Sequence, residues 1–155
     1  MSTQQVQLSL LNISEIRKIS KTLIDYINNN CPYLPDNLEI DYQFLKDTDS
    51  LSIQDLPNGI KLKEYIDGVS YNGQYNFALY YKTNPQDTNE RFTAIDILDS
   101  ICTWIESIKT LDFEMENIKL NFVSQTQSAH LFSRADDGYL TYQALLTLNY
   151  EKWGN

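Results

Sequence analysis

The longest helical pattern of hydrophobic positions covers residues 87–109, where Asp87 and Glu90 are spaced as an N-cap and its capping-box partner. Apolar side chains recur there at three- and four-residue steps, which predicts a helix. They form two adjacent stripes, one of Phe92, Ile95, Leu98, Cys102 and Ile105, the other of Ala94, Ile97, Ile101, Trp104 and Ile108. Together the stripes span about half of the helix circumference or more, leaving only Asp96, Asp99, Thr103 and Glu106 as a clearly polar face. A sheet covers one side of such a helix, so we expect another element or another subunit to cover the rest.

A second helix is predicted near the N-terminus, where Asn12 and Glu15 again have capping spacing. It has one apolar stripe, made of Ile13, Ile16, Ile19, Leu23, Ile24 and Ile27. Its solvent side carries Arg17, Lys18, Lys21, Asp25 and Asn28. The asparagines at 28–30 and Pro32 end the pattern. Residues 1–11 are expected to form a flexible N-terminus.

Between and after these helices the hydrophobic period changes to two, which predicts strands with one buried face. The segments with this alternation are 38–44, 60–66, 69–81, 118–122, 129–134 and 140–150. Gly73 predicts a bulge or a bend in the long strand. Residues 46–59 are interpreted as polar turns fastened by a few leucine and isoleucine side chains, with Asn58-Gly59 as a hairpin signal. Asp136-Asp137-Gly138 predicts a tight turn before the last strand.

The order of helix, strands, helix, strands predicts an α+β fold. We expect an antiparallel sheet of about four to six strands with two main helices on one face, because alternating strands of this kind have one covered side. At 155 residues the chain is long enough for its own core, and residues 1–155 are expected to form a single domain.

The charge narrows the range of functions. The chain has 12 Lys and Arg against 21 Asp and Glu, for a net charge of −9. Gripping nucleic acid requires clustered basic residues, and here they are scattered. The acidic balance is compatible with solubility, or with a channel wall that DNA passes without sticking. No membrane span or signal peptide is recognisable, so we expect the protein to be made in a cytoplasm and not to act at a membrane.

Few residues suggest chemistry. His130 is the only histidine, and a general base using it with Asp136 or Asp137 is left open as a small-hydrolase alternative. The three aspartates within residues 47–55 lack the glycine and glutamate of a calcium loop. Phosphate-binding glycine loops and Cys-x-x-Cys pairs are missing from the sequence. We therefore expect a protein that is not an enzyme and has no catalytic residue, cofactor or metal.

Tyrosines are concentrated on the predicted strands, where they suit both half-buried sheets and protein interfaces. Tyr80 is the better interface candidate among them, because alternation places it on the face opposite Phe77, Leu79 and Tyr81. The full set of candidate subunit or partner contacts, including residues from the broad helix, is Tyr71, Tyr75, Tyr80, Ile97, Ile101 and Trp104.

An ordered set of landmarks runs through nearly the whole chain. They are Cys-Pro-Tyr-Leu-Pro-Asp-Asn at 31–37, Glu-Tyr-Ile-Asp-Gly at 64–68, Gln-Tyr-Asn-Phe-Ala at 74–78, Trp-Ile-Glu at 104–106, Tyr-Gln at 142–143 and Leu-Asn-Tyr at 148–150. In this set the chain resembles the tail terminator proteins of long-tailed bacteriophages, often labelled minor capsid or tail completion proteins. None of the landmarks is a catalytic motif.

The resemblance implies a structural role in the virion. Such proteins form a ring, usually a hexamer, on the finished end of the tail tube, stop tube growth and present a surface to the neck proteins. It implies an antiparallel sheet flanked by helices, a location at the tail–neck junction after assembly in the bacterial cytoplasm, and partners that include other copies, the tube protein and head–tail connector proteins. DNA would pass through the lumen without specific binding. The alternatives are another neck or head completion protein and, in a different class, an acidic intracellular binder such as a nucleic-acid mimic.

Overall fold

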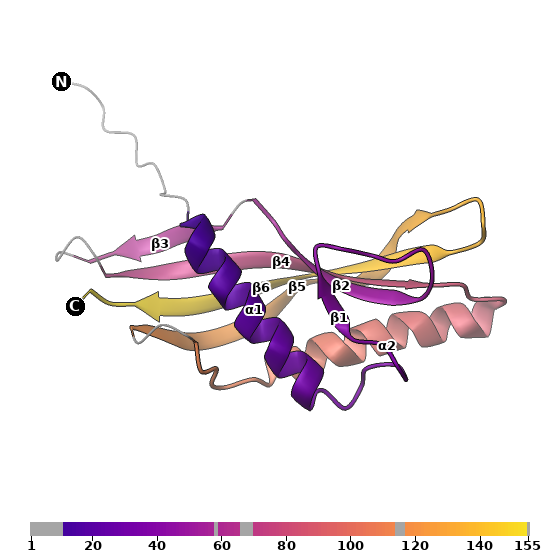
Figure 1. The fold of residues 1–155 in the computed structure, drawn as a ribbon, viewed down its shortest axis with the longest axis horizontal. Helices are drawn as coiled ribbons and strands as arrows, with labels where there is room; N and C mark the ends of the chain where they lie inside the picture. The colour runs from indigo at the N-terminus through magenta and orange to yellow at the C-terminus, as the bar shows by residue number, and fades with distance from the viewer. Residues whose placement is uncertain (1–10, 58, 66–69, 114–116, 155) are drawn as a thin grey trace, which may run out of the picture.

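A computed structural model describes residues 11–57, 59–65, 70–113 and 117–154. The elements in chain order are α1 (Ile13–Asn30), β1 (Ile40–Tyr42), β2 (Ser50–Asp55), β3 (Ile60–Glu64), β4 (Tyr71–Thr83), α2 (Thr88–Glu106), β5 (Ile118–Arg134) and β6 (Leu140–Lys152). The strands form one six-stranded sheet in the order β1-β2-β4-β6-β5, with β3 paired to β4 (Figure 1). All pairs except β1–β2 are antiparallel, so the predicted α+β class is confirmed.

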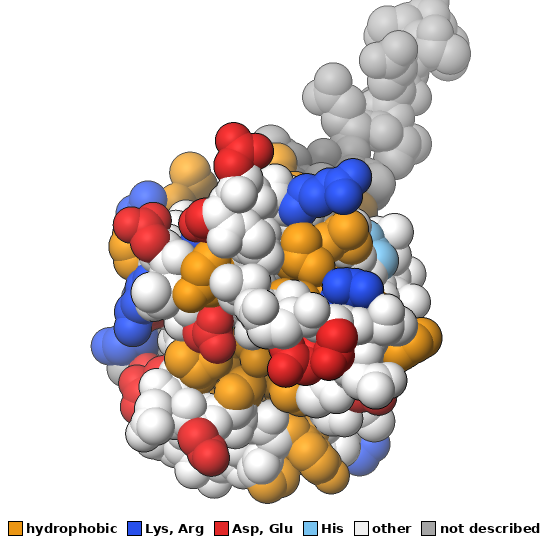
Figure 2. Space-filling view, turned by 90° about the vertical axis from the view of Figure 1, so that its right-hand side faces the viewer, with side chains coloured by type: hydrophobic (Ala, Val, Ile, Leu, Met, Phe, Trp, Pro, Cys, Tyr) orange, Lys and Arg blue, Asp and Glu red, His pale blue; other side chains and the backbone are white. Residues whose placement is uncertain are grey.

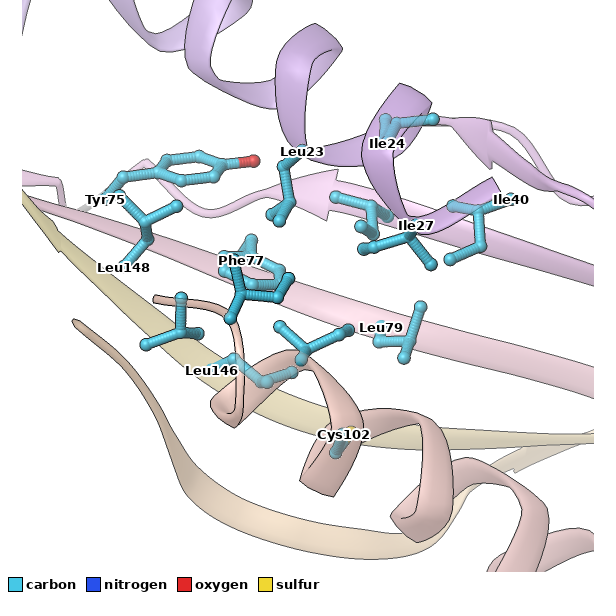
Figure 3. Close-up of a cluster of buried hydrophobic side chains, with 14 of the residues drawn as sticks. Leu23, Ile24, Ile27, Ile40, Tyr75, Phe77, Leu79, Cys102, Leu146 and Leu148 are labelled. Atoms are coloured by element: carbon cyan, nitrogen blue, oxygen red, sulfur yellow. The ribbon is translucent and has the colours of Figure 1, made fainter. Parts of the chain in front are cut away.

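Both helices cover the same face of the sheet, as predicted. Leu23, Ile24 and Ile27 of α1 and Cys102 of α2 gather over Phe77, Leu79 and Leu146 of the central strands (Figure 3). The alternate residues of β4 and β6 that point to this side are buried in one hydrophobic core with the inner faces of the helices. The period-two pattern of these two strands was therefore a correct guide to which side is covered.

The helix boundaries follow from their caps. The Asn12 side chain accepts hydrogen bonds from the backbone N–H groups of Ser14 and Glu15, and the Asp87 side chain accepts one from Glu90 N at 2.8 Å. Helix α2 ends at Glu106, with Ser107 as C-cap, so it is shorter than the predicted 87–109. Residues 1–10 of the expected flexible N-terminus lie outside the described residues, whereas Leu11 is buried.

The region before β4 differs most from the prediction. Residues 46–59, expected to be turns, contain the strand β2, in which Leu51 and Ile53 are fully buried. Strand β1 is only three residues long and pairs parallel to β2, which makes the sheet mixed. The serines of β2 explain the difference, because the hydroxyls of Ser52 and Ser50 accept backbone hydrogen bonds from the β1–β2 loop. A polar side of the strand thus anchors the loop instead of facing water.

Strands β2 and β3 lie one after the other along the same edge of β4, so Asn58-Gly59 does not join a hairpin. Asn58 itself lies outside the described residues, and so does Asp67-Gly68, a dipeptide whose composition also predicts a turn. Near Gly73 the register shift is in β3, between Lys61 and Lys63, rather than in β4. Gly73 instead leaves room for the Tyr150 ring on the neighbouring strand.

Strand β5 is one strand of 17 residues, where two shorter stretches were predicted. Four register shifts interrupt its pairing with β6, at Leu120/Phe122, Gln125/Gln127, Gln127/His130 and Leu131/Ser133. Each shift interrupts the alternation of buried and exposed side chains, so the sequence of this strand lacks a continuous two-residue hydrophobic period. The predicted turn between the two strands is confirmed, with Gly138 in the left-handed region at φ 92°.

Candidate assembly surface

The six predicted contact residues lie in three different places. Tyr71, Tyr75 and Ile101 point into the core, with exposed fractions of 6%, 0% and 0%. Tyr80 lies on the opposite face of the sheet, as predicted, and is 7% exposed. Side chains in the core do not present surface to a partner, so the exposed part of the set is reduced to Ile97 and Trp104, which are half-buried on α2.

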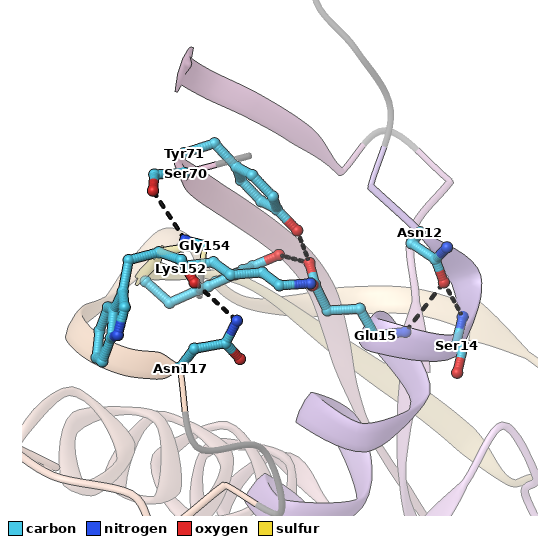
Figure 4. Close-up of polar contacts among 10 residues, drawn as sticks. Asn12, Ser14, Glu15, Ser70, Tyr71, Asn117, Lys152 and Gly154 are labelled. Atoms are coloured by element: carbon cyan, nitrogen blue, oxygen red, sulfur yellow. Dashed lines mark hydrogen bonds and ion pairs between the residues drawn. The ribbon is translucent and has the colours of Figure 1, made fainter. Parts of the chain in front are cut away.

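One of these core tyrosines, Tyr71, belongs to a buried polar cluster around Glu15. Its carboxylate accepts hydrogen bonds from the hydroxyls of Tyr71 and Tyr150 and pairs with Lys152 Nζ at 2.7 Å (Figure 4). Burial raises the pKa of Glu15, but the hydrogen bonds from Lys152, Tyr150 and Tyr71 outweigh burial and leave it below its ordinary value. Glu15 is 4% exposed, so an unpaired charge there would be costly. The cluster therefore fastens the start of α1 to the ends of β4 and β6.

A second carboxylate fastens the middle of α1. Asp55 on β2 accepts hydrogen bonds from the hydroxyls of Tyr75, Tyr42 and Ser20. Burial and the Asp55 carboxylate raise the pKa of Tyr42 to about 12. Both clusters serve packing between helix and sheet, because each joins α1 to strands and neither opens on the other side of the sheet. Sequence periodicity did not find them, since Glu15 fits a helix cap and Asp55 a polar turn equally well.

The outer side of α2 carries a groove that also reaches the loop after α1. Tyr33, Asp96, Asp99, Ser100, Thr103, Trp104 and Ser107 line a cavity of about 480 Å³, which we call the α2 groove. Tyr33 is 52% exposed, and Trp104 stacks on Tyr26 of α1 with ring centroids 5.8 Å apart. The groove combines aromatic walls with carboxylates. Its chemistry suits a cationic side chain, which is attracted to both.

The predicted polar face of α2 is not wholly exposed. Asp99 Oδ1 accepts hydrogen bonds from Ala129 N at 2.9 Å and Gln125 Nε2 at 3.2 Å, and Glu106 Oε2 accepts one from Gln125 N at 3.1 Å. These donors lie where β5 shifts register against β6 and lacks regular partners. Half of the expected wet face is therefore used to hold β5, while Asp96 and Thr103 remain exposed.

The sheet face away from the helices is polar around one aromatic contact. Tyr80 packs edge-on against Phe132 at 5.2 Å, and its hydroxyl accepts a hydrogen bond from Gln143 Nε2 at 2.8 Å. His130 Nε2 contacts Gln143 Oε1 at 3.0 Å and its Nδ1 contacts Ser128 O at 2.8 Å. The polar partners of His130 are thus Gln143 and Ser128 rather than Asp136 or Asp137, the pairing on which the hydrolase alternative depended.

Charges are interspersed on the visible surface. Figure 2 views the end of the molecule at the right of Figure 1, and carboxylates, basic side chains and hydrophobic side chains alternate across its described part. The densest basic group in the sequence is Arg17, Lys18 and Lys21, all exposed on α1. A continuous basic track of the kind that binds nucleic acid is not seen in the described part of this face.

The described residues show neither a metal-binding group nor a membrane-spanning helix. They contain no group of three or more His, Cys, Asp or Glu side chains placed to hold a metal ion. Neither described helix is both long enough and apolar enough to cross a membrane.

Comparison with known proteins finds similarity only at the level of structure. No protein-family model matches the chain, and no curated protein matches its sequence. A chain in the solved virion of a native gene transfer agent particle has the same fold, with a TM-score of 0.64, 6% identity and coverage of 90% of this chain and 99% of that one. Another solved structure, 15% identical, covers 92% of this chain and 96% of its own at a TM-score of 0.46, which is too low to support an argument.

Proposed function

We propose that this chain is a structural, non-enzymatic protein of a phage-like virion that acts as the tail terminator. In this role it forms a ring, a hexamer by the family resemblance, on the end of the tail tube at the tail–neck junction. The ring stops tube growth and offers the surface to which the neck and head–tail connector proteins join. Tyr71, Tyr75, Tyr80, Ile97, Ile101 and Trp104 were the contact residues expected from the sequence; the exposed ones, Ile97 and Trp104, are the ones proposed here as contacts.

The observation that carries the proposal is the whole-chain likeness to a chain of the gene transfer agent virion, at a TM-score of 0.64. The likeness covers 90% of this chain and 99% of the other, so it concerns the overall fold rather than a common substructure. The ordered landmarks from residues 31 to 150 supply the step from that fold to tail termination. The net charge of −9 supports a lumen through which DNA passes without being held.

A different neck or head completion protein is the second candidate, since a virion neighbour with this fold supports either position. The acidic binder or nucleic-acid mimic is less well supported, because mimics need carboxylates in dense rows and Asp99, Glu106, Glu15 and Asp55 are used in internal hydrogen bonds.

The test is electron microscopy of particles made when the gene is deleted from its parent phage. Overlong or unjoined tails beside filled heads are the expected result. Normal-length tails with unattached heads would move the role to the neck. Normal infectious particles would refute a virion function, and a complementing plasmid copy serves as the control in each case.

A further inference from the structure

The α2 groove is well placed to receive a charged side chain from another molecule. Within the described part of the chain, the Asp96 carboxylate is exposed and has no polar partner. Asp99, beside it, uses one oxygen to hold β5. Tyr33 and Trp104 provide aromatic walls. A lysine or arginine entering the groove would meet a free carboxylate and the electron-rich faces of the rings, which favour it most once water is excluded.

A candidate for such a side chain is present on α1. Three of the 12 basic residues of the chain lie close together on this helix, and all three are exposed: Arg17, Lys18 and Lys21. They lie on the first half of α1, whereas the groove lies along the second half of α2 and the loop after α1. Figure 1 shows α1 running from its start at the upper left down to the end of α2, where Tyr26 of α1 stacks on Trp104, so the basic segment and the groove lie toward opposite ends of α1.

When two complementary surfaces lie at different places on a subunit, one surface of each copy can bind the other surface of the next copy, which is a head-to-tail contact. Such contacts close into a ring when the rotation between neighbouring copies allows it. The overall charge of −9 makes copies repel each other, and a local pairing of opposite charge offsets this repulsion at a contact. The basic segment and the α2 groove provide that pairing.

We propose that the α2 groove of one subunit receives the basic segment of α1, centred on Lys18, from a second copy of this chain, and that this is the contact that closes the ring. The inference deepens the proposed function by naming the subunit contact, and it rests on that function only for the ring's place on the tail. Charge pairs of this kind set orientation and partner choice.

A cysteine cross-link tests the contact directly. Thr103→Cys in the groove and Ser14→Cys, one helical turn before Lys18, are combined in a Cys31→Ser chain, so that the charged side chains of the contact are kept. Cys102 is left in place because it is fully buried. After oxidation of the purified full chain and of isolated tails, non-reducing gels should show a ladder of multimers that ends at one closed species. Each cysteine alone should give no ladder, while a mixture of the two single variants should give dimers. Absence of the ladder from both samples would overturn the proposal.

A charge exchange tests the same contact in particles. Asp96→Lys and Lys18→Glu should each lower the titre of joined, infectious particles about 100-fold, and the double variant should recover at least about tenfold of that loss. Asp47→Lys, a charge reversal on the exposed β1–β2 loop that lines neither the groove nor the basic segment, is the matched control and should have no effect. Unchanged thermal melts exclude misfolding. Wild-type titres for both single variants, or a double variant no better than the worse single one, would overturn the contact.

These results separate the two proposals. A ladder of cross-linked multimers together with normal tails after gene deletion would support the proposed subunit contact and refute tail termination. Abnormal tails after deletion, with neither ladder nor rescue, would keep tail termination and refute the contact. Loss of joining by Asp96→Lys that Lys18→Glu does not rescue would assign the groove to a different virion protein and likewise overturn self-contact.

Discussion

Gly73 offers a sharp test of how β4 and β6 pack. It lies directly across from Tyr150 in the antiparallel pairing of these strands. A Cβ atom at position 73 would lie 2.5 Å from both Cε1 and Oη of Tyr150, and closer still to Cζ. Carbon atoms in contact prefer a separation of about 3.5–4.0 Å, so in Gly73→Ala the ring must move by about 1 Å or more.

The ring has little freedom to move. Tyr150 is fully buried, and its hydroxyl donates to Glu15 Oε2 at 2.6 Å. Overpacking a core costs about 1–3 kcal/mol. Loss of a hydrogen bond to a charged group costs about 1.5–3 kcal/mol. Against these costs, replacing glycine by alanine reduces the conformational entropy of the unfolded chain, which stabilises the folded state by about 0.4–1 kcal/mol. We expect Gly73→Ala to lower the free energy of unfolding by about 2–5 kcal/mol, a large fraction of the 5–15 kcal/mol typical of a domain (about 0.1 kcal/mol per residue).

Urea unfolding followed by circular dichroism measures this change. The matched background is Tyr150→Leu, which removes the ring atoms that the new methyl group would strike. In that background the added methyl should be nearly neutral, giving a coupling free energy of at least about 1 kcal/mol between the two positions. The reasoning is refuted if Gly73→Ala is as stable as the wild type, or if its cost is the same with and without the Tyr150 ring.

Three other substitutions probe the polar contacts that fix the helices. Glu15→Gln should remove a part of the stability that depends on pH. Burial raises the pKa of Glu15, but hydrogen bonds from one lysine and two tyrosines lower it by more, so that it lies below its ordinary value in the folded protein. The ionised carboxylate therefore stabilises the fold at neutral pH and ceases to do so as the pH falls through the folded pKa, so the difference from wild type should shrink from about 3 kcal/mol on acidification; a constant difference in unfolding titrations would contradict this. Asp99→Ala should cost about 1–3 kcal/mol and speed amide hydrogen exchange at Ala129, because that N–H loses its acceptor; unchanged exchange would count against it. Asp87→Ala should cost about 1 kcal/mol by leaving Glu90 N without its cap, measured as a lower Tm, and an unaltered Tm would argue that the cap is unimportant.

Local patterns in the sequence identified the elements whose structure depends on near neighbours. The caps at Asn12 and Asp87, the covered side of β4 and β6 and the Gly138 turn all follow from residues a few positions apart. The strand β2 was missed because its serines resemble turn residues until the loop that they anchor is present. The full length of β5 was missed because four register shifts break its alternation, and near the middle two the backbone is held by α2 carboxylates from a distant part of the chain.

The candidate contact residues also divide into those that local sequence patterns identify correctly and those whose position depends on distant parts of the chain. Periodicity cannot distinguish a side chain that packs in the core from one that packs on a partner, because both require an apolar or aromatic residue at the same spacing. Ile101 and Trp104 belong to one stripe, yet the first is fully buried and the second borders a groove. Only the position of the neighbouring elements decides between these outcomes.

The sequence alone therefore determined the fold class, the two helices, the central strands and an excess of apolar surface on α2, since propensity and hydrophobic period act within a few residues. The tertiary structure decided the parallel β1–β2 pair, the burial of Glu15 among tyrosines and the meeting of Tyr33 with Asp96 in one groove. Each of these joins residues that are distant in the chain. Their contacts depend on how helices and strands pack together, which no local pattern encodes.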